Sequence, residues 1–323
     1  MRILLSVFLA LTFVTCAQVA SAADDYPSRP IRFIVPFTPG TGMDNIARQV
    51  GEKLFASWKQ PVIVENRTGL AGHLGAELVA RAAPDGYTLL VSASNLAITA
   101  TLYAAPSFQP MTDLAPIMIA ARGTNSLAVT GNGKYTSMAQ FIADAKARPG
   151  KINFASAGVG SPSHMLLAEF EAATGTQFLH VPYKGTAPGV NDLLAGHVDA
   201  MFVATHTLQP HTASGQLVNL GVNSDSRHRT APGVPSFAEL GIKPATPGWY
   251  GFLAPKNTPP ELIQKINKEF ARILELPDVK GTLEKTGLDV RPSGPEELRE
   301  LMQRQYKDYG DIIRKNGITA VDK

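Results

Sequence analysis

The segment at residues 36–45, PFTPGTGMDN, places Gly40, Thr41, Gly42 and Asp44 between an apolar run and a helical pattern. The first backbone N–H groups of a helix have no partner within the helix, and the helix dipole makes that end positive. Such a turn binds anions, and glycine lets the chain bend and a ligand approach closely. An ordinary strand-to-helix turn capped by Thr41 or Asp44 explains this segment equally well when it is considered alone. The third glycine of a dinucleotide motif and the Gly-Lys-Ser/Thr ending of a phosphate loop are both missing.

Two later turns have the same character. Residues 157–164, AGVGSPSH, follow a strand-like run, and Ser161 followed by Pro162 is a strong signal for the start of a helix. Residues 183–187, YKGTA, follow another strand-like run and precede a further helical pattern. Ligands of open α/β sheets bind beyond the carboxyl ends of the strands, so three such turns can converge on one cleft. This arrangement suits a small carboxylate.

Short β-rich runs alternate with helical periods along the chain, which predicts parallel sheets covered by helices on both faces. Because about 300 residues exceed what one hydrophobic core usually organises, we expect two lobes. The first lobe should contain residues 24–122 and 249–323, and the second should contain residues 123–248. Two chain crossings, near residues 120–123 and 248–251, would then form a hinge. The expected strands are at residues 31–35, 62–65, 88–92, 126–130, 152–156, 178–181, 199–203, 217–222 and 249–254.

Residues 1–23 have the pattern of a secretory signal peptide. A positive Met1-Arg2 start is followed by an apolar run and by the small residues of Ala20-Ser21-Ala22. The apolar run falls short of the roughly 20 residues that span a bilayer. Cleavage would remove Cys16, the only cysteine, so no disulfide or thiolate chemistry is expected. A lipoprotein is the alternative, although Thr15 is a poor match to the small residue that precedes a lipidated cysteine.

Composition and motif spacing exclude several classes of function. The formal net charge is +3, 18% of residues are charged, and no Lys/Arg block occurs, so no nucleic-acid partner is expected. The histidines lack metal-ligand spacing, so we expect neither a metal nor a cofactor. No Gly-x-Ser-x-Gly elbow occurs, and Ser161 to His164 lack an obvious orienting carboxylate, so we do not expect an enzyme.

Seven short motifs follow one another in the order found in one protein family. They are residues 26–31 (YPSRPI), 35–44 (VPFTPGTGMD), 64–67 (VENR), 83–88 (APDGYT), 161–164 (SPSH), 180–185 (HVPYKG) and 249–251 (WYG). With these motifs the mature chain resembles the solute receptors of tripartite tricarboxylate transporters, the Bug-type periplasmic binding proteins. The resemblance implies an α/β, type II periplasmic binding protein fold, in which two Rossmann-like lobes joined by a two-crossing hinge hold the ligand cleft between them.

The resemblance also implies a function. A periplasmic monomer would capture a small carboxylate, namely a di- or tricarboxylic or an aromatic acid, and deliver it to the subunits of a membrane transporter. An alternative is a periplasmic carboxylate sensor that feeds a signalling system, and a hydrolase is the weaker rival. The family often has an acidic residue where Val203 stands, so an amino-acid ligand is less expected here.

The ligand-binding residues that the resemblance implies come from both lobes. They are Thr38, Gly40, Thr41, Gly42 and Asp44 in the first lobe and Ser161, Ser163, His164, Tyr183 and Thr186 in the second. The ends of two strands add Ser92, Ser94, Asn95 and His206 as candidates. For His164 a local capping role is an equal alternative, and for His206 simple exposure to solvent is another.

Overall fold

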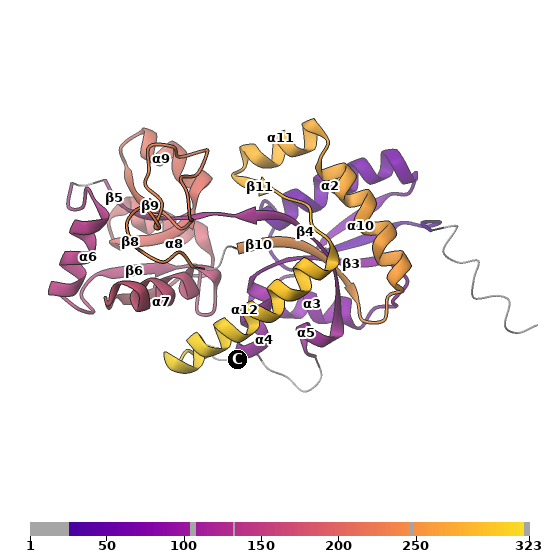
Figure 1. Ribbon diagram of the computed structural model, residues 1–323, viewed down its shortest axis with the longest axis horizontal. Coiled ribbons are helices and arrows are strands. Elements are labelled where there is room, and N and C mark those ends of the chain that lie inside the picture. Colours follow the sequence, from indigo (N-terminus) through magenta and orange to yellow (C-terminus); the bar gives the residue numbers. More distant parts are fainter. Residues whose placement is uncertain (1–25, 104–107, 132, 246–247, 320–323) are drawn as a thin grey trace, which may run out of the picture.

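The computed structural model describes residues 26–103, 108–131, 133–245 and 248–319, which form two sheets lying side by side (Figure 1). The predicted signal peptide lies outside the described residues. The strand order is β11-β4-β10-β3-β1-β2 in one sheet and β7-β6-β8-β5-β9 in the other. We call the sheet that contains β1, with the helices packed on it, the first lobe, and the other sheet with its helices the second lobe.

The first lobe has helices on both faces of its sheet. Its strands are β1 (Ile31–Val35), β2 (Val62–Asn66), β3 (Thr88–Ala93), β4 (Leu114–Gly123), β10 (Gly248–Pro255) and β11 (Leu288–Val290). One face packs on α2 (Gly42–Trp58), α10 (Pro260–Leu274) and α11 (Pro277–Lys285). The other face is covered by η1 (Leu70–Gly72), α3 (His73–Ala80), α4 (Asn95–Leu102), α5 (Pro110–Asp113) and α12 (Pro295–Lys315). Because both faces are covered, the central strands are mainly apolar.

The second lobe is built in the same way. Its strands are β5 (Asn125–Thr130), β6 (Asn153–Ser156), β7 (Leu179–Pro182), β8 (Ala200–Ala204) and β9 (Leu217–Val222). Helices α6 (Met138–Ala147) and α7 (Pro162–Thr174) cover one aromatic core, and α8 (Thr186–Ala195) covers the other face. The short helices η2 (Thr205–Leu208) and α9 (Gln209–Ala213) follow β8.

The prediction of parallel sheets is correct for β1, β2 and β3 and for β6, β7 and β8, but wrong for the strands at the crossings. Strand β10 runs antiparallel to both β3 and β4, and β5 runs antiparallel to both β8 and β9. The reason is geometric, since a strand arriving from the other lobe enters its sheet from the hinge end. Strands β4 and β11 were also not predicted from the sequence.

The two lobes touch beyond the chain crossings. Strand β4 ends at Gly123 and β5 begins at Asn125, while the return crossing leads into β10. A separate apolar cluster joins Ala97 and Ile98 of α4 to Met165 of α7, and α12 completes it. Figure 1 shows α12 running from the first lobe toward α7. No helix among the described residues is long and apolar enough to cross a membrane.

Candidate functional site

Asp44 holds the turn between β1 and α2 from inside. Its side chain is 3% exposed, and it accepts hydrogen bonds from the Gly40 amide (3.0 Å), Arg48 Nε (2.9 Å) and Asn66 Nδ2 (3.0 Å). Burial alone raises the pKa of this carboxyl, but the hydrogen bonds from Arg48, Gly40 and Asn66 outweigh burial and bring the pKa below its ordinary value. Asp44 and the Gly40 amide are therefore occupied within the lobe, and they shape the turn.

The start of α2 leaves backbone donors open. Thr41 is the N-cap, since its Oγ1 accepts the amide of Asp44 at 3.4 Å and donates to the Thr38 carbonyl at 3.2 Å. Within the described part of the chain, no hydrogen bond uses the amides of Thr41, Gly42 and Met43. These N–H groups stand at the positive end of a 17-residue helix and fit an anion.

The ends of β2 and β3 meet this turn. A methyl group added at Gly72 would lie 2.9 Å from both Asn95 Nδ2 and Phe37 Cε2, so three loops come together here. Asn95 Nδ2 donates to the Ala71 carbonyl at 2.8 Å, whereas Asn95 Oδ1 is buried without a partner. Ser94 Oγ has no described hydrogen bond, and Ser92 is completely buried within β3. Asn95 thus lies where the loops at Phe37 and Gly72 meet, Ser94 precedes it in the chain, and Ser92 is enclosed within β3.

The second-lobe turn at residues 157–164 satisfies most of its own polar groups. Ser161 caps α7 by accepting the amide of His164 at 3.3 Å, and Ser163 Oγ accepts the amide of Ala157 at 2.9 Å. The Gly160 amide donates to His164 Nδ1 at 3.2 Å, which places the ring proton on Nε2. Ser161, Ser163 and His164 therefore build the turn, and His164 Nε2 stays available as a donor.

His164 and His180 form a stacked pair. Their ring centroids are 3.9 Å apart with 12° between the planes, and His180 Nε2 lies 2.6 Å from Ser156 Oγ. Burial and the neighbouring His180 lower the pKa of His164 to about 4, and burial lowers the pKa of His180. Both rings are neutral at neutral pH, so the pair supplies hydrogen bonds and shape without adding charge.

The start of α8 is an open helix end in the second lobe. Its N-cap, Gly185, provides no side-chain cap, and the Thr186 hydroxyl has no described partner. The nearby Tyr183 hydroxyl instead donates to Asp192 Oδ2 at 2.6 Å, and burial and this contact raise the pKa of Tyr183 to about 12. His206 lies in η2, and its side chain is outside the described part of the structure.

The second-lobe turn touches the first lobe directly. A methyl group added at Gly160 would lie 2.2 Å from Leu102 Cδ1 and 3.9 Å from Ile98 Cγ2, both on α4. Helix α4 begins at Asn95, so one helix connects the first-lobe loops to the second-lobe turn. The described contacts thus bring the second-lobe turn at Gly160 against α4 of the first lobe.

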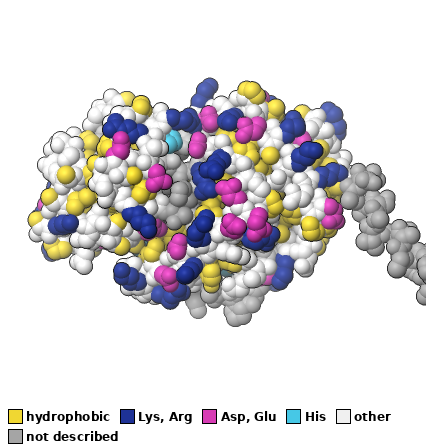
Figure 2. Space-filling view, viewed as in Figure 1, with side chains coloured by type: hydrophobic (Ala, Val, Ile, Leu, Met, Phe, Trp, Pro, Cys, Tyr) yellow, Lys and Arg dark blue, Asp and Glu magenta, His cyan; other side chains and the backbone are white. Residues whose placement is uncertain are grey.

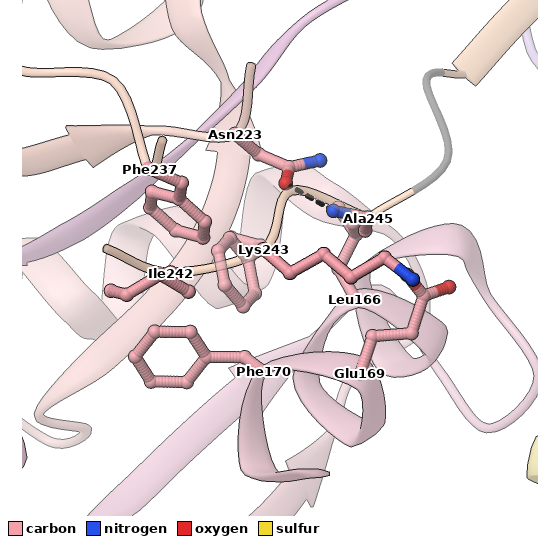
Figure 3. A pocket seen from close by; sticks show the side chains of 9 residues that line it. Leu166, Glu169, Phe170, Asn223, Phe237, Ile242, Lys243 and Ala245 are labelled. Carbon is pink, nitrogen blue, oxygen red and sulfur yellow. Dashed lines mark hydrogen bonds between the residues drawn. The ribbon is translucent and has the colours of Figure 1, made fainter. Parts of the chain in front are cut away.

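Two hollows are lined by second-lobe residues alone. The hollow shown in Figure 3 has a volume of about 10 Å³, which is room for one water, and two of its lining residues are joined by the 2.8 Å hydrogen bond from the Ala245 amide to Asn223 Oδ1. A second cavity, of about 350 Å³, lies between η2, β9 and the loop at residues 230–234. None of its described lining residues is charged.

The visible surface and the described side-chain clusters point to no second kind of binding site. In Figure 2, Lys/Arg and Asp/Glu side chains are interspersed over the visible face, which shows no broad patch of one sign. Within the described ranges, no group of three or more His, Cys, Asp or Glu side chains is placed to hold a metal ion.

Comparisons with known proteins identify the family. The family model described as "Tripartite tricarboxylate transporter family receptor" matches residues 46–318. Protein BugT of Bordetella pertussis is 35% identical over 311 residues, which cover 94% of this chain and 95% of BugT.

Solved structures agree with the family model. The periplasmic binding protein BugD superposes with a TM-score of 0.79 at 32% identity, covering 91% of this chain and 99% of BugD. Rpa4515 of R. palustris with adipate superposes with a TM-score of 0.82 at 28% identity, and the match covers 92% of this chain and 100% of Rpa4515. MatC of Rhodopseudomonas palustris with bound malate superposes with a TM-score of 0.77 at 27% identity, and the match covers 89% of this chain and 100% of MatC. These neighbours confirm the type II periplasmic binding fold, and the family is one of binding receptors, not of enzymes. The chain therefore belongs to the receptor family of the tripartite tricarboxylate transporters, with Bug proteins among its relatives.

Proposed function

We propose that this protein captures a small di- or tricarboxylic or aromatic acid in the periplasm and delivers it to the membrane subunits of a tripartite tricarboxylate-type transporter. The observation that carries the proposal is the set of open amides at Thr41, Gly42 and Met43, which lie beyond the carboxyl end of β1. Solved relatives with adipate and with malate support a carboxylate as the ligand.

The proposed capture uses both lobes. A ligand carboxylate docks on the α2 amides, and closure brings the Thr186 hydroxyl and the open end of α8 against the ligand. The bound acid stabilises the closed state because it makes second-lobe contacts only there. Residues 1–23 act as a cleaved export signal. We keep 24–122 and 249–323 as the first lobe and 123–248 as the second.

The polar groups favour acids without an amino group. Asp44, the carboxylate nearest the α2 amides, is already paired with Arg48 and hydrogen-bonded to Gly40 and Asn66. It is therefore not free to receive a ligand ammonium group. Val203, at the end of β8, is apolar and buried, so it offers no replacement.

The test is a binding screen with a matched pair of variants. We expect malate, adipate or benzoate to raise the melting temperature and aspartate to do so less, since a ligand at about 100 times its Kd stabilises by roughly 2.7 kcal/mol. Gly42→Val should abolish binding, because its Cβ would lie 3.0 Å from Tyr250 Cζ and the added side chain would crowd the unpaired amides at the start of α2. Gly281→Val is the control, since nothing lies within 4 Å of a methyl group added at this helical glycine.

Several results would contradict the proposal. If Gly42→Val bound the acid with unchanged affinity, this turn would not be part of the site. If the protein bound none of the acids, a carboxylate would not be its ligand. Sustained product formation from acid esters by the pure protein would make it an enzyme. Delivery is tested by uptake of the bound acid in cells, which should fall when this chain is deleted and return with the wild-type copy.

A further inference from the structure

Tyr250, on the return strand β10, lies next to the open start of α2. A methyl group added at Gly42, the first residue of α2, would lie 3.0 Å from Tyr250 Cε1 and Cζ and 3.3 Å from Oη. A methyl group added at Gly123, where the chain leaves the first lobe, would lie 2.9 Å from Cε2 and 3.5 Å from Oη. The ring therefore fills the space between the start of α2 and the first chain crossing, and a side chain at either glycine would displace it.

The local strand geometry supports this placement of the ring. Tyr250 is paired with Ala93 on β3 and with Ala121 on β4, so its neighbours across the sheet are small. The register between β10 and β4 shifts between Tyr250 and Gly251, and such irregularities change the direction of a side chain near functional sites. Half-buried in this way, the ring is held in place by packing.

The Tyr250 hydroxyl has no partner of its own. Among the described residues no hydrogen bond involves Oη, whereas Tyr26 and Tyr183, two other lobe tyrosines, donate to Gly86 and Asp192. Burial raises the pKa of Tyr250, so the phenol stays protonated and remains a donor at physiological pH. Oη is not among the buried polar atoms that lack a partner, so it is open to solvent and free to donate a hydrogen bond to a ligand beside α2.

We propose that Tyr250 contacts the bound acid and donates its hydroxyl proton to the carboxylate that the Gly42 and Met43 amides hold. This inference rests on the proposed function. It adds a side chain of strand β10 to a site that is otherwise built from strand-to-helix turns. Because β10 is also the return crossing between the lobes, the contact ties ligand binding to the strand about which the lobes close. Tyr250 is thereby a residue that determines affinity and the choice of ligand.

Calorimetric titration of the full mature chain with malate, succinate and adipate tests this assignment. Tyr250→Phe removes only Oη, so we expect malate and succinate to bind at least about 10-fold more weakly, which is what one hydrogen bond to a charged group contributes. The melting temperature without ligand should not change, because Oη makes no hydrogen bond with any residue that the structure describes. Tyr306→Phe, at an exposed tyrosine of α12, is the matched control and should keep wild-type affinity.

A second variant tests the position of the ring. Gly123→Ala should weaken binding because its Cβ would press on Tyr250 Cε2, and in a Tyr250→Ala background the same substitution should change affinity little. Equal affinities for wild type and Tyr250→Phe would overturn the inference while leaving the proposed function standing. A loss for malate but not for succinate would also overturn it, since Oη would then contact the malate hydroxyl. A wild type that binds none of the acids would overturn the proposed function and this inference together.

Discussion

Replacing Asp44 tests the idea that a buried carboxylate organises the anion-binding turn. Asp44→Ala removes the acceptor shared by the Gly40 amide, Asn66 Nδ2 and Arg48. A hydrogen bond to a charged group contributes about 1.5–3 kcal/mol, but Gly40 and Arg48 are exposed and regain water. We therefore expect a loss of about 3 kcal/mol in the free energy of unfolding.

The measurement is urea unfolding together with titration of a bound acid. Asp44→Asn keeps one acceptor oxygen, so it should lose about half as much stability as Asp44→Ala. Asp311→Ala is the control, because its ion pair with Arg314 is exposed and should contribute less than about 0.5 kcal/mol. Since the folded-state pKa of Asp44 lies below its unfolded value, its contribution is present above about pH 4 and is lost as pH falls through the folded pKa. A stability of Asp44→Ala within 0.5 kcal/mol of wild type, or an unchanged ligand affinity, would refute the role given to this carboxylate.

Three further outcomes are expected. As pH falls from 6.5 toward 4, the unfolded chain binds a proton that folded His164 does not, so stability should drop by up to about 3 kcal/mol, and His164→Gln should show a shallower decline in pH-dependent unfolding. Gly160→Ala should lower the free energy of unfolding by about 2 kcal/mol, because this residue has φ +72° and its Cβ would overlap Leu102. The double variant with Leu102→Ala should lose less stability than the sum of the two single losses, and strict additivity would contradict the contact. Trp249→Phe should cost about 2–4 kcal/mol in denaturant unfolding, since it removes the 2.7 Å hydrogen bond that Trp249 Nε1 donates to Gln305 and leaves a cavity at a fully buried side chain, and a cost below about 1 kcal/mol would contradict this.

Local patterns in the sequence were sufficient to predict most strands and the helix starts. The β1 run, the Thr41 cap and the Ser161-Pro162 start of α7 are short-range features, since each depends on residues within one turn of the chain. For the same reason the three glycine- and hydroxyl-rich turns were recognisable as candidate anion sites. The sequence could not distinguish a donor open to a ligand from one already used inside the lobe.

That distinction depends on partners distant in sequence. Asn66 reaches Asp44 from β2, and Asp192 occupies the Tyr183 hydroxyl from α8. The antiparallel return of β10, which brings Tyr250 beside Gly42, has no local signal at all. Sequence by itself determined the family motifs and the local elements, because these follow from residue type and short-range spacing. Only the tertiary structure decided which polar groups remain unpaired at the site, because pairing is settled by contacts between strands and helices that the chain brings together from far apart.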